Sequence, residues 1–116
     1  MGRIITQEKI DMMEQARSAD PQAVGPALGY MLIKGNVPIE AAASALSVSE
    51  PTIYRWMYGQ SAPRDGDKID KVKRFMTTLR KAKRERDLPL TGTVTARLKE
   101  MEKILIKHKP VQKSSI

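Results

Sequence analysis

The sequence of 116 residues contains no cysteine and only one histidine, and aromatic residues make up 4% of it. Without cysteine there can be no disulfide, thiolate metal site or cysteine nucleophile. His108 stands alone near a Lys-Pro pair, whereas zinc sites need three or four clustered ligands, so we expect no metal. Hydrophobic residues, at 41%, suffice for a single small core.

The sequence also lacks any run of about 18 apolar residues and any apolar segment at its start, which argues against a transmembrane helix and a signal peptide. We therefore expect a soluble, cytoplasmic protein that does not enter a membrane. There is no Ser-His-Asp set, no pair of carboxylates in an apolar setting and no glycine-rich phosphate loop. The sequence predicts neither an enzyme nor a bound cofactor.

Positive charge is concentrated in the second half of the chain. Residues 1–63 carry five basic and six acidic side chains, whereas residues 64–116 carry sixteen and seven. The formal net charge of +8 therefore comes entirely from the second half. Such an asymmetry predicts a polyanionic partner, most often nucleic acid.

Hydrophobic periodicity predicts helices nearly throughout, because apolar residues recur at helical intervals and never alternate over the length of a strand. Thr6 is expected to cap a first helix. Asp20 is expected to cap a second, with Pro21 at its first position and Gly35 and Asn36 at its end. Further helices are expected at 39–46, 49–58, 67–86 and 94–107, the last capped by Thr93.

Residues 42–63 are the most informative segment, because two short helices joined by a three-residue turn form a helix-turn-helix. Ala43 is small where the two helices would cross. Leu46 and Val48 are expected to point into the core, and Ile53 and Trp56, three residues apart, to form the buried face of the second helix. The opposite face would present the following residues to a major groove: Glu50, Pro51, Thr52, Arg55 and Tyr58.

The residues of this segment that carry a resemblance are Ala43, Leu46, Val48, Ser49, Thr52, Ile53, Arg55, Trp56, Gly59 and Pro63. Their spacing resembles that of the lambda-repressor-like DNA-binding domain, the Cro/C1 or xenobiotic-response-element type of helix-turn-helix. The resemblance implies a five-helix domain over about residues 20–82. Three positions depart from the family pattern: Ser47 replaces the usual Gly of the turn, Ile39 a Gln that touches phosphate, and Pro51 a base-reading Gln or Asn.

The expected architecture is therefore an all-α, lambda-repressor-like domain with two additions. Residues 1–19 would form an extra N-terminal helix and residues 20–86 the helix-turn-helix domain. Residues 87–108 would form a C-terminal helix, and residues 109–116 a flexible tail.

If the resemblance holds, the segment 49–58 is a recognition helix. Arg55 is the main candidate for reading a base, since Arg bound to guanine is the commonest specific contact, and Glu50, Pro51 and Tyr54 complete the base-contacting set. Phosphate contacts are expected from side chains at the helix start, along the loop that follows it and on the next helix. These are Ser49, Thr52, Tyr58, Arg64, Lys81, Lys83 and Arg84.

The last helix carries a short heptad pattern, formed by Val94, Leu98, Met101 and Leu105. Two heptads are short for an independent coiled coil. A dimer interface, as family members usually have, and a helix folded back on its own domain core are both open at this point.

The function expected from this sequence is sequence-specific binding of double-stranded DNA by a homodimeric transcriptional regulator, as in a repressor of a phage or mobile element. Two other functions remain open. One is a viral DNA-packaging recognition subunit, which a ring of eight or more subunits would distinguish from a dimer. The other is a helix-turn-helix that docks on the transcription machinery, an alternative that Glu50 and Pro51 at the start of the recognition helix keep open.

Overall fold

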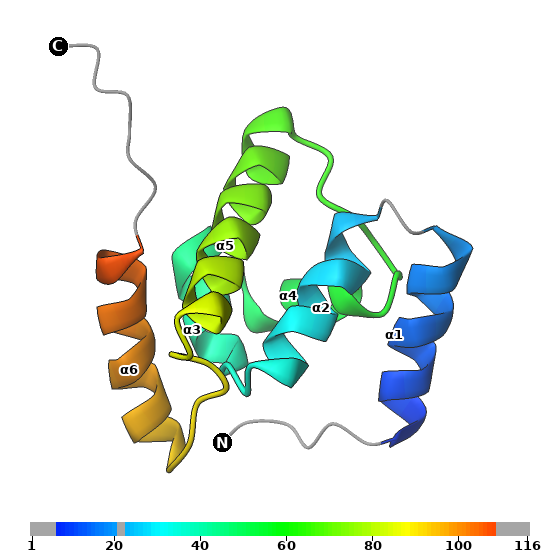
Figure 1. The fold of residues 1–116 in the computed structure, drawn as a ribbon. Coiled ribbons are helices and arrows are strands. Elements are labelled where there is room, and N and C mark those ends of the chain that lie inside the picture. The colour runs from blue at the N-terminus through cyan, green and yellow to red at the C-terminus, as the bar shows by residue number, and fades with distance from the viewer. Residues whose placement is uncertain (1–6, 21–22, 109–116) are drawn as a thin grey trace, which may run out of the picture.

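A computed structural model of the chain describes residues 7–20 and 23–108, and within these residues it is entirely helical (Figure 1). The elements are α1 (Gln7–Ala19), α2 (Val24–Lys34), α3 (Ile39–Leu46), α4 (Glu50–Met57), α5 (Gly66–Arg84) and α6 (Val94–Lys107). The all-α expectation is thus confirmed for the described residues. The predicted cap Thr6, Pro21 and the tail 109–116 lie outside them.

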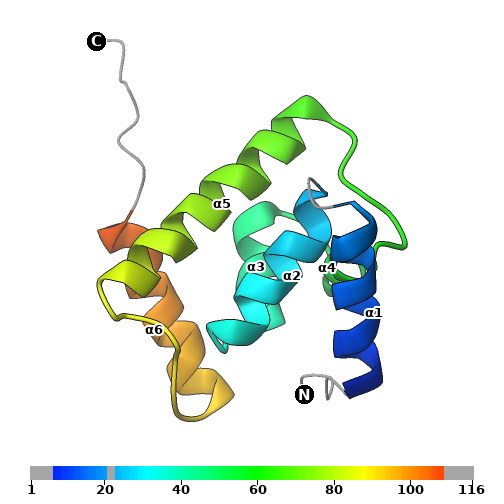
Figure 2. The same cartoon turned by 45° about the vertical axis from the view of Figure 1, so that its right-hand side comes forward.

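Helix α2 occupies the centre of the fold and contacts α1, α4 and α5 (Figures 1 and 2). Two glycines allow the close approach of α2 and α4. A Cβ atom at Gly25 would lie 2.4 Å from the carbonyl oxygen of Trp56, and one at Gly29 would lie 2.8 Å from Cγ of Met57. Helix α4 also packs on α3, and α6 packs against α3 and α5. Figures 1 and 2 both show α4 behind α2.

Helix boundaries follow the predicted caps where a side chain accepts a backbone hydrogen bond. The N–H of Ala96 donates to the Thr93 hydroxyl at 3.1 Å at the start of α6. Helix α2 is an exception, because it begins at Val24 after Ala23, so the cap predicted at Asp20 is wrong. Helix α5 ends at Arg84, two residues earlier than expected, and Arg86 beyond it has a left-handed backbone with φ 66°.

One hydrophobic core draws on all six helices. Trp56 and Ile53 are 5% and 0% exposed, which confirms their predicted burial. Met13 brings α1 into this core and Ile104 brings α6. Within the described residues of the expected five-helix domain the structure has four helices, α2 to α5, and the additional helices α1 and α6 share their core.

The heptad pattern of α6 faces its own chain. Met101 is 1% exposed in the core, so its predicted role in a dimer interface is wrong. Leu98 and Leu105 are half-buried and pack against the same core. Val94 and Ile106, at 38% and 78%, are the exposed large hydrophobic residues of α6. The pattern is thus explained by packing of α6 on α3 and α5.

Candidate nucleic-acid interface

Helices α3 and α4 are joined by the three residues Ser47, Val48 and Ser49. Ser47 has a left-handed backbone, with φ 56° and ψ 45°, so it adopts the conformation for which glycine is usual at such a turn. The N–H of Val48 then donates to the carbonyl of Ala43 at 3.0 Å. Ala43 and Leu46 are buried as predicted, and Val48 is half-buried against the core.

Ser49 caps α4 through its side chain. Its hydroxyl oxygen accepts from the N–H of Thr52 at 3.3 Å and lies 2.9 Å from the Thr52 hydroxyl. Pro51 occupies the first turn, where no backbone donor is needed. The start of α4 is therefore held by its own side chains, while Ser49, Glu50 and Pro51 remain exposed.

The exposed face of α4 is narrower than predicted. Tyr54 is 5% exposed and Tyr58 is 9%, and their rings stack with centroids 6.1 Å apart. The predicted contacts of these two tyrosines with bases and phosphate are therefore wrong. Helix α4 buries a broad face because it packs on α2 and on α3 at once. Pro51 and Arg55, four residues apart and both exposed, form the centre of what remains, with half-buried Thr52 at its edge.

No protein-family model, curated protein or solved structure matches this chain.

The basic residues predicted to contact phosphate fall into two groups. Arg64 is exposed in the loop after α4. Lys68 at the start of α5 donates to the carbonyl of Leu46 at 2.9 Å, which fastens this end of α5 beside the turn. Lys81 and Arg84 lie thirteen and sixteen residues further along α5, about 20–24 Å at 1.5 Å per residue.

Lys83 lies near the same far end of α5 and lines a hollow between α2 and α5. Lys81 and Arg84 line another hollow, together with Lys107 and His108 of the α6 end. The structure thus does not bring these three cations to the exposed face of α4.

The structure also brings together a cluster of titratable groups that the sequence did not predict. Glu85, Asp87 and His108 place possible ligand atoms within 4.8 Å of one another. Nε2 of buried His108 lies 2.8 Å from Oδ2 of Asp87, and Nζ of Lys107 lies 3.0 Å from the same oxygen. These hydrogen bonds lower the pKa of Asp87, that from His108 most, and the bond to Asp87 raises the pKa of Lys107.

This cluster joins the end of α6 to the segment after α5. The ammonium of Lys107 already neutralises the Asp87 carboxylate, so we interpret the cluster as a structural ion-pair network. No local pattern could reveal this cluster, because Asp87 and His108 are 21 positions apart.

Proposed function

We propose that the chain is a sequence-specific double-stranded DNA-binding protein that reads the major groove with α4 and regulates transcription by occluding a promoter. The resemblance to lambda-repressor-like domains supports this proposal. The observation that carries it is the division of α4. One side is packed on α2 and α3, and the other exposes the first turn and Arg55.

In this mechanism the start of α4 approaches the phosphate backbone, where the positive end of the helix dipole favours an anion. Ser49, Thr52 and Arg64 then supply phosphate contacts that position the helix. Arg55 donates two hydrogen bonds to a guanine edge. Pro51 contacts a thymine methyl, and Glu50 accepts from a cytosine amine. No catalytic step is involved.

Selection from random DNA duplexes, read by sequencing, tests the proposal. The wild type is expected to enrich one motif, and Arg55→Ala to relax the preference at one base position at a cost of about 1–3 kcal/mol. Lys99→Ala is the matched control, because Lys99 is an exposed cation on α6, away from α4. If the wild type enriches no motif, or if both variants change binding equally, α4 does not read sequence.

The oligomeric state, measured in the same preparation by light scattering, separates the regulator from a packaging subunit. A monomer or dimer supports the proposal, whereas a ring of eight or more subunits supports packaging. A dimer cannot use Met101, which is buried within its own chain.

A further inference from the structure

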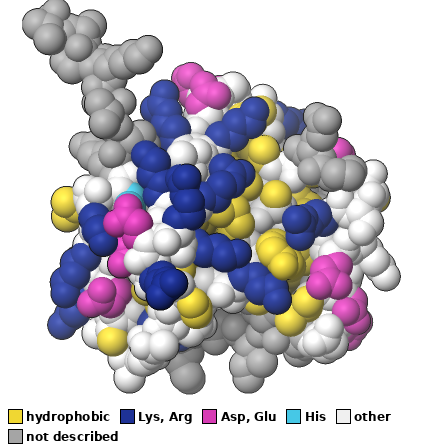
Figure 3. Space-filling model, viewed as in Figure 1, with side chains coloured by type: hydrophobic (Ala, Val, Ile, Leu, Met, Phe, Trp, Pro, Cys, Tyr) yellow, Lys and Arg dark blue, Asp and Glu magenta, His cyan; other side chains and the backbone are white. Residues whose placement is uncertain are grey.

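An apolar groove with basic edges runs between α2 and α5. A hollow of about 320 Å³ has a floor that includes Ala27, Tyr30, Met31, Met76, Leu79 and Leu88. A neighbouring hollow shares Ala27 and Met76 with it and extends it toward Val24 and Lys73. Figure 3 shows hydrophobic side chains exposed between Lys and Arg side chains on this face.

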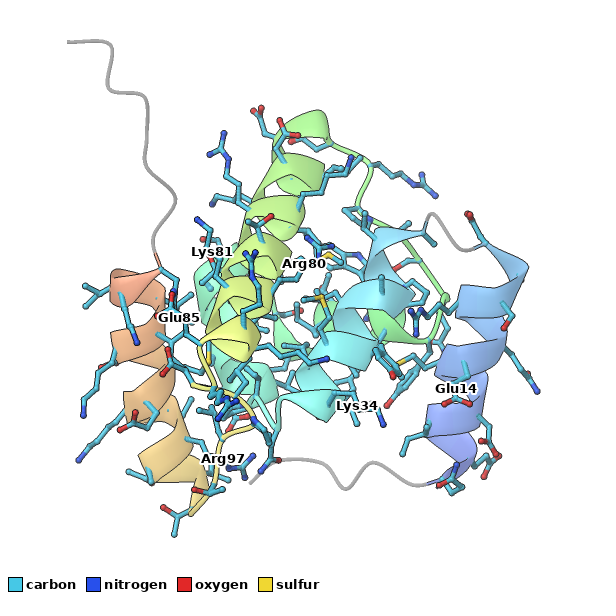
Figure 4. The ribbon with its side chains drawn as sticks, in the orientation of Figure 1. Glu14, Lys34, Arg80, Lys81, Glu85 and Arg97 are labelled. Atoms are coloured by element: carbon cyan, nitrogen blue, oxygen red, sulfur yellow. The ribbon has the colours of Figure 1, made fainter. Side chains whose placement is uncertain are left out.

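Both edges of this groove are positive. Arg17 and Lys34 lie on the α1 and α2 side, and Arg80 and Lys83 on the α5 side; Figure 4 shows Lys34 and Arg80 on their two helices. Among the described residues, no carboxylate lines either hollow.

Tyr30 holds two of these cations at the groove. The guanidinium carbon of Arg17 lies 4.3 Å from the centre of the Tyr30 ring, and Nζ of Lys34 lies 5.5 Å from it. Both distances are within the range of cation–π attraction. The positive edge on this side is therefore positioned by an aromatic ring, with its charge still available to a ligand.

We propose that this groove docks an acidic amphipathic helix of a partner protein. An apolar floor takes the hydrophobic stripe of a helix, and cations along both edges match carboxylates on its two flanks. From Lys73 to Lys83 the α5 edge covers eleven residues, and the ten steps between the two ends rise about 15 Å, which is the length of nearly three helical turns. Nucleic acid would leave the methionine and leucine floor without apolar side chains to contact.

The groove is separate from the proposed DNA-reading surface. Helix α2 lies between them, since it contacts α4 and α5 through different parts of its surface. Gly25 and Gly29 approach α4, whereas Ala27, Tyr30 and Met31 line the groove. A bound partner helix therefore leaves Arg55 free, and this inference does not depend on DNA reading by α4.

A display library of random 16-residue peptides, selected on the full chain, tests the groove. We expect the enriched peptides to carry apolar residues at i, i+3, i+4 and i+7 with Asp or Glu beside them. Their affinity, measured by fluorescence anisotropy, should fall at least tenfold on Arg80→Glu with Lys83→Glu. It should fall less than twofold on Lys71→Glu with Arg74→Glu. This control has the same charge change on the same helix, but neither of its residues lines the groove.

A second variant, Ala27→Trp, fills the floor without altering charge and should also weaken binding at least tenfold. Circular dichroism verifies that each variant is folded. The proposal is overturned if selection enriches no acidic amphipathic pattern, or if the two charge variants lose affinity equally. It is also overturned if random-sequence duplex DNA or phosphatidylglycerol vesicles displace the peptides, because the groove would then bind a general polyanion.

Discussion

Substituting Gly25 by alanine tests how tightly α2 sets the position of α4. Alanine is favoured over glycine by about 1 kcal/mol in a helix interior, but Gly25 is the second residue of α2 and precedes Pro26, where a Cβ atom is disfavoured in the helical conformation, so little of this gain applies. The added Cβ would lie 2.4 Å from the Trp56 carbonyl oxygen and 2.9 Å from its carbonyl carbon. Real Cβ atoms do not approach backbone atoms so closely, and ordinary contact begins at 3.4 Å.

Helix α4 would have to move away from α2 by about 1 Å to accept this methyl group, the difference between ordinary contact and 2.4 Å. Overpacking of this kind costs about 1–3 kcal/mol, and more where backbone must shift. We therefore expect Gly25→Ala to lower the free energy of unfolding by about 1–3 kcal/mol. For a chain of this size, that corresponds to a fall in Tm of about 4–12 °C.

Urea unfolding followed by circular dichroism measures this change, and Gly66→Ala is the control. Gly66 is the first residue of α5, and a Cβ atom there would have no neighbour within 4 Å. The control should stabilise the protein by about 0.4–1 kcal/mol, because alanine reduces the entropy of the unfolded chain. If Gly25→Ala stabilises the protein as Gly66→Ala does, then α4 does not lie against α2 as described.

Three further predictions concern the core and α6. Trp56→Ala should lower the free energy of unfolding by about 3–5 kcal/mol, and an equally stable variant that only lost DNA binding would contradict its place in the core. Leu98→Glu with Leu105→Glu should destabilise the chain in thermal unfolding, because both residues pack on the core; a stable folded monomer obtained from a wild-type dimer would instead support a dimer interface. Asp87→Asn should destabilise the protein at neutral pH. The pKa of Asp87 is lowered in the folded state, so its hydrogen bond to His108 stabilises the fold only while the carboxylate is ionised. The difference in Tm from wild type should therefore shrink as pH falls below the usual value of 3.8; a difference that persists there would mean that ionisation is not its cause.

Local signals predicted the helices because each signal acts within a few residues. Ser49 and Thr93 accept hydrogen bonds from the N–H groups three residues on, so their caps could be read from the sequence. The cap predicted at Asp20 rested on the same kind of local signal, a capping residue followed by proline. It was wrong because α2 begins three residues beyond Pro21, at Val24.

The burial of Tyr54 and Met101 could not be predicted in this way, because it depends on contacts between distant segments. Tyr54 is buried because α4 packs on two helices, whereas the periodicity marked only Ile53 and Trp56. The pattern containing Met101 was equally compatible with a partner chain and with the chain's own core. The groove between α2 and α5 escaped the sequence reasoning as well, since residues 17, 34 and 80 meet only in the fold.

The central position of α2 also determines the order in which parts of the molecule can open. Helices α1 and α6 lie at opposite edges of the fold, and each can detach while the helices between them stay packed. Helix α2 cannot detach without separating α1, α4 and α5 together. Its amide protons should therefore exchange with solvent only through global unfolding, and those of α1 and α6 through smaller openings. A duplex bound at α4 and a peptide bound in the groove would restrain α2 from its two sides, so either ligand should slow exchange in the same helix.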